Sequence, residues 1–89
     1  ARRIVTTLVE ERLAACGNLV PNVESIYRWQ GAVETASEVL VLLEAEIRSY
    51  SALETRLQEL HPYEVPECLG VNIAKGASPY LRWLNESVK

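Results

Sequence analysis

A seven-residue segment with two prolines, His61-Pro62-Tyr63-Glu64-Val65-Pro66-Glu67, constrains the fold of this chain more than any other stretch. Each proline fixes φ and lacks a backbone N–H donor, so the segment can be neither the interior of a helix nor a central strand. It is predicted to be a stiff, extended connection between a helix and a strand. The segment also holds the only histidine of the chain, a tyrosine and two glutamates, which makes these side chains candidates for a binding site.

Length and composition limit the possible classes of protein. The chain has 89 residues, of which 48% are apolar, and a formal net charge of −3. This length predicts a single domain over residues 1–89, small enough that assembly with other copies is a common source of further buried surface. The basic residues are scattered, which argues against a surface for nucleic acid or for an anionic membrane. The longest strongly apolar run, Val39–Leu43, is far too short to span a bilayer.

The two cysteines, Cys16 and Cys68, lie far apart and lack the spacing of a metal-binding or redox pair. Two unpaired thiols in a chain without a signal peptide predict a reducing, cytoplasmic location. The simpler interpretation of each cysteine is a small buried hydrophobic residue. The chain contains no methionine, so residue 1 is not an initiator, and a segment before Ala1 is expected to be missing.

Hydrophobic periodicity and turn signals divide the chain into six elements. Period-3.6 patterns predict helices and period-2 patterns predict strands. Ser51 and Glu54 have the spacing of a capping box, and Ser78 followed by Pro79 is a typical helix start. The predicted elements are a helix over 1–15 with a stop at Gly17-Asn18, strands over 19–30 and 33–46, a helix over 51–60, a strand over 67–73 and a helix from Pro79 onwards.

The two long strands flank Gly31 and are predicted to form a β-hairpin. Each arm has about a dozen residues, or roughly 40 Å, so its tip should extend beyond the core. Pro21 cannot donate to the ladder and predicts an edge or a bulge in the first arm. In the second arm, Val39–Leu43 is apolar on both faces and requires cover on both, which a chain with so few helices lacks. Another copy of the chain is therefore expected to cover it.

The order helix, strand, strand, helix, strand, helix is that of a βαββαβ pattern without its first strand, followed by an extra helix. The predicted fold class is α+β, a ferredoxin-like sandwich with a long β-hairpin and an extra C-terminal helix, in which the upstream first strand is absent from this chain.

Four ordered stretches together resemble the CutA family, the divalent-cation tolerance proteins. The resemblance extends from about Ala1 to the C-terminus. It implies a homotrimer assembled through the long hairpin and a function in the response to divalent metal ions, above all copper. The four stretches are Leu8–Cys16, Ser25–Gly31, His61–Glu67 and Pro79–Leu84.

The candidate metal-binding residues are His61, Glu67 and Cys16. Imidazole combined with thiolate or carboxylate suits copper or zinc, although no pair has a standard zinc spacing. In family members described as copper-binding, the site resembles two histidines just before the proline plus a cysteine of the first strand. Leu60 stands where the extra histidine would be, so only His61 matches that pattern. The alternative interpretation is that His61 caps the preceding helix, where a cation is favoured.

A second group of candidates consists of Tyr27, Trp29, Tyr63 and Glu64, which combine flat apolar surface with a carboxylate. The resemblance implies that the hairpin tip and the proline segment lie near the trimer interface. A cleft there would be similar to the ligand sites of trimeric nitrogen-regulatory signal proteins. The alternative is that the aromatic residues only hold subunits together. Glu44 stands where the family usually has a lysine, a change that favours a cation over an anionic ligand.

Nothing in the sequence indicates catalysis. The chain has no aspartate, which excludes a Ser-His-Asp triad, and a Cys16–His61 pair would lack a specific orienting group. Its four glycines are too widely spread for a phosphate-binding loop. The chain is therefore predicted to be a non-enzymatic protein of the metal-ion response. The alternatives are a trimeric small-ligand signal protein and a structural trimer with no ligand of its own.

Overall fold

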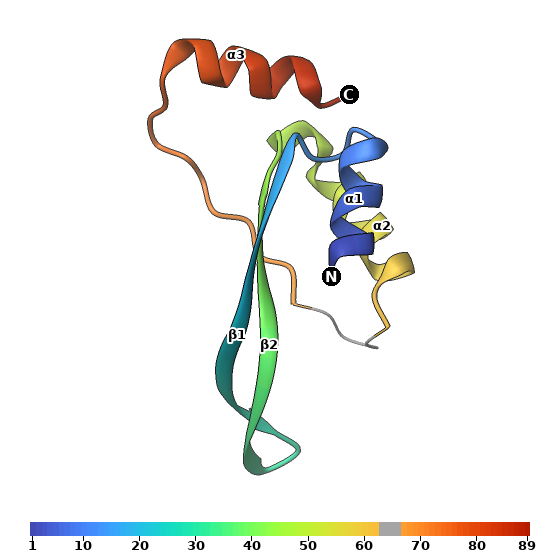
Figure 1. Cartoon of the computed structure of the whole chain (residues 1–89), viewed down its shortest axis with the longest axis vertical. Coiled ribbons are helices and arrows are strands. Elements are labelled where there is room, and N and C mark those ends of the chain that lie inside the picture. The colour runs from blue at the N-terminus through green and yellow to red at the C-terminus, as the bar shows by residue number, and fades with distance from the viewer. Residues whose placement is uncertain (63–66) are drawn as a thin grey trace.

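The computed structural model describes residues 1–62 and 67–89, so the predicted site residues Tyr63 and Glu64 lie outside the described residues. A long hairpin extends away from helices that gather at its base, and one further helix lies across the end of that base (Figure 1). The elements are α1 (Arg2–Glu10), β1 (Cys16–Trp29), β2 (Ala32–Glu44), the short 3-10 helix η1 (Ile47–Ser49), α2 (Tyr50–Leu60) and α3 (Ser78–Ser87).

The predicted hairpin is confirmed. β1 and β2 pair antiparallel from the base, where Cys16 faces Glu44, to the tip, where Trp29 faces Ala32. The connecting residues Gln30 and Gly31 both have positive φ, as the two-residue turns that match strand twist require.

The ladder of the hairpin is interrupted once, between Val20 and Val23. The two intervening residues include Pro21, which has no N–H to donate, and Asn22, which adopts a positive φ of 59°. The bulge predicted from Pro21 is therefore present. Beyond it, the alternation of β1 side chains between the two faces of the hairpin is shifted by one residue.

The first helix is shorter than predicted and ends at Glu10. Arg12 adopts a positive φ of 61°, after which the N–H groups of Leu13 and Ala14 both bond back to the carbonyl of Leu8. This turn buries Leu13 and Ala14 in the core. β1 consequently begins at Cys16, and the predicted helix stop at Gly17-Asn18 is wrong, because these residues belong to the strand.

The core lies between α1, α2 and the base of the hairpin. Leu8 of α1 is completely buried and meets Leu53 of α2 together with Leu13 and Ala14. Cys68 packs against this cluster, in agreement with its interpretation as a small hydrophobic residue. A bidentate ion pair between Arg56 and Glu11, with the closest nitrogen and oxygen 2.8 Å apart, also joins α2 to the end of α1.

The start of α2 differs from the predicted capping box. The helix begins at Tyr50, so Ser51 lies within its first turn. Ser49 occupies the N-cap position, but its hydroxyl donates to the carbonyl of Lys89 at 2.9 Å, a long-range contact that sequence spacing cannot predict. The helix ends as predicted at Leu60.

Two arginines hold the C-terminal end of α3. Arg12 donates to the carbonyl of Glu86 at 2.6 Å, and Arg48 donates to Asn85 Oδ1 at 2.6 Å and to the carbonyl of Val88 at 2.9 Å. Cations are favoured at this end of a helix, where carbonyl groups lack helical partners. At the other end, α3 begins one residue earlier than predicted, with Ala77 rather than Ser78 at the N-cap position and Pro79 within the first turn.

The predicted strand over residues 67–73 is wrong. The segment is extended, but it pairs with neither of the two strands in the described parts of the chain. Its apolar side chains are largely exposed, with Val71 at 89%. An extended segment forms a strand only where its backbone pairs with a neighbouring strand. The α+β class is confirmed, and the hairpin with its flanking helices forms the helix–strand–strand–helix part of the predicted pattern.

Truncation of Leu8 tests the core. Leu8→Ala removes a fully buried side chain and is expected to lower the free energy of unfolding by roughly 3 kcal/mol, measured by urea denaturation at a fixed protein concentration. Ile47→Ala is the matched control, because Ile47 is 83% exposed, and it should change stability by less than about 0.5 kcal/mol. Equal effects of the two substitutions would contradict the assignment of the core.

Candidate functional site

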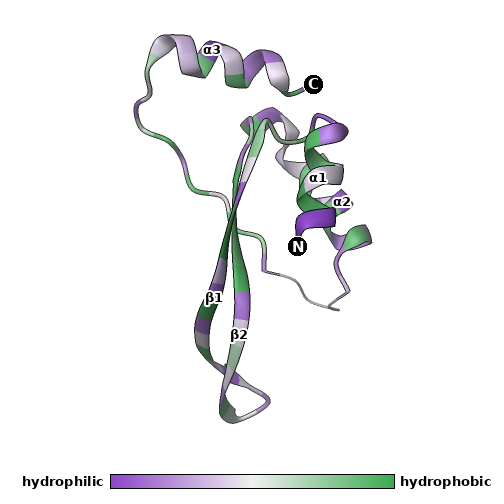
Figure 2. Cartoon of the chain, viewed as in Figure 1, coloured by the Kyte–Doolittle hydropathy of each residue, from purple (hydrophilic) through white to green (hydrophobic). Residues whose placement is uncertain are grey.

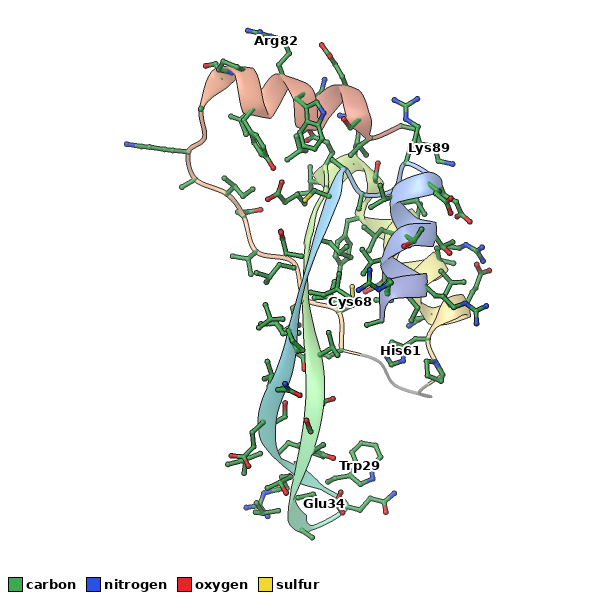
Figure 3. All side chains as sticks on the ribbon, in the orientation of Figure 1. Trp29, Glu34, His61, Cys68, Arg82 and Lys89 are labelled. Atoms are coloured by element: carbon green, nitrogen blue, oxygen red, sulfur yellow. The ribbon has the colours of Figure 1, made fainter. Side chains whose placement is uncertain are left out.

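His61 lies at the C-cap of α2, where its backbone N–H bonds to the carbonyl of Leu57 at 2.8 Å. The side chain is partly buried, and Figure 3 shows it at the edge of the helical layer. His61 therefore ends α2 through its backbone, and the alternative that its imidazole caps the helix stays a prediction. Any metal-binding role of the imidazole remains a prediction.

The three predicted metal donors do not form one site. Cys16 begins β1, His61 ends α2, and Glu67 is exposed on the extended segment that follows. Across residues 1–62 and 67–89, no group of three or more histidine, cysteine, aspartate or glutamate side chains is close enough to hold a metal ion. A copper site formed by this donor set within one chain does not fit the structure.

The predicted interface aromatics lie at the far end of the hairpin. Tyr27 and Trp29 occupy the same face of β1 and remain about half exposed, opposite Glu34 and Ala32 on β2. Figure 3 shows Trp29 and Glu34 near the tip, well separated from His61 and Cys68. The two aromatic side chains are therefore distant from the core of their own chain, and their surfaces are open to a ligand or another subunit.

At the opposite end of the hairpin, the structure assembles a cluster that the sequence did not reveal. Tyr80 of α3 donates a hydrogen bond from its hydroxyl to Glu44 Oε1. Glu44 ends β2 directly opposite Cys16, and the amide of Asn18 lies 3.9 Å from the Cys16 sulfur. The Tyr80 ring also packs against Trp83, with centroids 5.3 Å apart and planes inclined at 45°. We call Cys16, Glu44 and Tyr80 the base cluster.

The base cluster changes the acidity of its tyrosine. The hydrogen bond to Glu44 is the main cause that raises the pKa of Tyr80 to about 12, with burial and the nearby charges of Glu44 and Cys16 acting in the same direction. A phenolate at this position would face the carboxylate, so the neutral phenol is favoured.

A second group of the same composition lies beside the core. The Tyr50 hydroxyl is 3.1 Å from Glu54 Oε2, 3.2 Å from the carbonyl of Cys68 and 3.8 Å from its sulfur. The contact with Cys68 is the main cause that raises the pKa of Tyr50 to about 12, followed by burial and by Glu54. The i, i+4 spacing of Tyr50 and Glu54 could have suggested part of this group, whereas nothing local links Tyr80 to Glu44.

A cavity of about 550 Å³ opens between α1, the start of β1 and α3. Its size is within the usual range for small-molecule sites. Apolar side chains dominate its lining, and Cys16 of the base cluster forms part of its wall. The lining residues are Arg2, Val5, Thr6, Val9, Glu10, Ala15, Cys16, Gly17, Leu19 and Trp83.

Comparison with known proteins identifies the family. The sequence pattern described as CutA1 divalent ion tolerance protein matches residues 1–87, and the chain belongs to this family. The divalent-cation tolerance protein CutA of Thermus thermophilus is 49% identical over 98% of this chain and 84% of its own length. The corresponding protein of Pectobacterium atrosepticum is 43% identical over all of this chain and 81% of its own length.

Solved structures support the same assignment. The structure described as divalent cation tolerance protein (Cut A1) from Thermus thermophilus superimposes with a TM-score of 0.97 at 48% identity, over 99% of this chain and 85% of that chain. The family recognised from four sequence stretches and the fold class inferred with it are therefore both confirmed.

The location of the relatives is not uniform. A solved structure from Archaeoglobus fulgidus, with a TM-score of 0.95 at 28% identity over 99% of this chain and 85% of its own, is described as periplasmic. A relative from Arabidopsis thaliana, 35% identical over 99% of this chain and 48% of its own length, is described as chloroplastic. In the part of this chain that the structure describes, no helix is long and apolar enough to cross a membrane.

Alkaline titration tests the two tyrosine contacts. The raised pKa values predict that Tyr80 and Tyr50 ionise near pH 12, about two units above an ordinary tyrosine. The stability that their hydrogen bonds contribute should be lost as the pH rises from about 10 to about 12. In a pH titration, phenolate absorbance should therefore show a late component, which appears only near pH 12 and which Tyr80→Phe and Tyr50→Phe each reduce. Glu44→Gln should move only the Tyr80 part to lower pH. A late component unchanged in Tyr80→Phe would contradict the Tyr80–Glu44 contact.

Proposed function

We propose that this chain acts as one domain that forms a homotrimer through its hairpin and serves the cytoplasmic response to divalent metal ions by binding them, without catalysis. The observation that carries the assembly is the apolar surface of the hairpin, where Val39, Leu40 and Leu42 are 44%, 47% and 54% exposed. Figure 2 shows apolar residues on both strands in the part of the hairpin that extends away from α1 and α2. Contiguous apolar patches of this kind mark interaction surfaces in small proteins.

The two faces of β2 explain why a partner is needed. Leu43 packs against the core, which assigns the α1 and α2 side of the strand to odd-numbered residues. Leu40 and Leu42 therefore point to the other face, which α1 and α2 leave open. Three copies that bring these faces together would bury both residues and place the tip aromatics Tyr27 and Trp29 against a neighbour.

Membership in a divalent ion tolerance family supports the ion-binding part of the proposal. His61 and Glu67 are the first and last residues of the proline segment and supply imidazole and carboxylate, a combination that suits copper. Because the described residues of one chain offer no three-donor set at this place, the proposed copper contact at His61 requires donors from a second subunit.

A second candidate function is a trimeric signal protein that binds a small metabolite in a cleft between the hairpin tip and the proline segment. The half-exposed rings of Tyr27 and Trp29 favour it, and Tyr63 and Glu64 would contribute from the other side. If neither an ion nor a metabolite binds, the aromatic residues serve only to hold a structural trimer together.

Native mass spectrometry tests the assembly. The wild-type chain is expected to appear as a trimer, and Leu40→Lys combined with Leu42→Lys should yield monomers, because charged side chains cannot be buried unpaired at the proposed interface. Ile47→Lys, which changes a more exposed apolar residue away from the hairpin, is the control and should remain trimeric. A monomeric wild type at micromolar concentration would refute the trimer.

Copper titration tests the ion contact. With one equivalent of Cu²⁺ per chain, the wild-type trimer should bind about one ion per chain, and His61→Ala should lose that ion while staying trimeric. Glu24→Gln, which neutralises an exposed carboxylate on the hairpin, should bind copper as the wild type does. Equal copper binding by wild type and His61→Ala would remove His61 from the proposed site.

A further inference from the structure

The base cluster brings three functional groups together at one end of the hairpin: the Cys16 thiol, the Glu44 carboxylate and the Tyr80 phenol. We propose that it forms a site for a thiophilic divalent ion of the zinc group, Zn²⁺ or Cd²⁺, with Cys16 and Glu44 as ligands and Tyr80 as the residue that positions the carboxylate. The inference goes beyond the proposed copper contact, since it assigns ion binding to a place other than His61.

Strand geometry brings the two ligands together. Cys16 and Glu44 are directly opposite residues of an antiparallel pair, whose Cβ atoms lie about 4.5–5.5 Å apart on the same face. A bond of 2.8 Å from the Ala15 N–H to the Glu44 carbonyl extends the ladder at this end. The next residue, Gly17, packs against Val5 of α1, so Cys16 and Glu44 face away from α1.

A hydrogen bond from α3 orients the proposed carboxylate ligand. The Tyr80 hydroxyl donates to Glu44 and leaves the second carboxylate oxygen available to an ion. Such outer hydrogen bonds orient metal-binding carboxylates. Cys16 and Trp83 both belong to the lining of the cavity of about 550 Å³.

The donor set selects the class of ion. Thiolate and carboxylate are both ordinary zinc ligands, and the soft sulfur disfavours magnesium and calcium. Binding displaces the thiol proton to solvent, so affinity should rise with pH. Two protein ligands leave the remaining coordination positions to water.

Cys68 provides a control within the same chain. It also has a phenol and a carboxylate nearby, those of Tyr50 and Glu54. Unlike Cys16, however, Cys68 packs against the hydrophobic core, and it is not part of the cavity lining. If the three residue types alone decided ion binding, both thiols would bind an ion. The surroundings of the two thiols favour Cys16 instead.

The test is a Cd²⁺ titration of the purified protein, followed through the ultraviolet thiolate-to-cadmium charge-transfer band. The wild type and Cys68→Ser should show the band, and Cys16→Ser should lack it. Glu44→Gln should weaken Cd²⁺ binding by about tenfold or more, and Tyr80→Phe by a smaller factor, as expected for a ligand and for a residue that positions it. The wild-type affinity should increase from pH 6 to pH 8, because the thiol must lose its proton.

A band retained in Cys16→Ser, or lost in Cys68→Ser, would overturn the inference. If Cys16→Ser does not fold, as judged by circular dichroism and native mass, the Glu44→Gln titration decides instead, and an unchanged affinity there would also overturn it. His61→Ala separates this inference from the proposed copper contact. Cadmium binding that survives in His61→Ala supports the base cluster whether or not copper binding is lost, and cadmium binding that His61→Ala abolishes assigns the ion to His61.

Discussion

The close contact between α1 and the first residues of β1 is the constraint on which the geometry of the hairpin depends. A Cβ atom at Gly17 would lie 2.4 Å from Val5 Cγ1, so only glycine allows the helix and the strand to approach this closely. With Gly17 facing the helix, Cys16 must face the other way. Because a slip of one residue would exchange the faces of the strand, this contact decides which side chains enter the core and which face outwards.

The hairpin separates two kinds of surface. At its tip, Tyr27 and Trp29 are half exposed and lie far from the helices. At its base, α3 lies across the end of the hairpin, where Tyr80 donates a hydrogen bond to Glu44, while Arg12 and Arg48 bond to the C-terminal end of the same helix. The residues proposed to carry assembly, Leu40 and Leu42, lie close to the base and share the face of β2 that carries Glu44.

Sequence patterns predicted the hairpin, α2 and α3 because their signals are local. Alternation and the turn at Gly31 are typical of a hairpin, and the leucines of α2 recur at helical spacing. The end of α1 could not be predicted in the same way, since Leu13 continues the helical pattern while Arg12 already turns the chain. The strand over residues 67–73 failed for a different reason: a period-2 pattern indicates an extended chain, but a strand also needs a neighbour to pair with.

The sequence by itself determined the α+β class, the position of the bulge at Pro21, the family and the choice of His61 as a candidate donor. Each of these depends on the order of residues along the chain or on a backbone restriction within one segment. Only the tertiary structure decided that Cys16, Glu44 and Tyr80 meet and that Cys16, His61 and Glu67 do not. The physical reason is that such encounters follow from strand register and from the path of α3 across the hairpin, and these are set by packing between elements far apart in sequence.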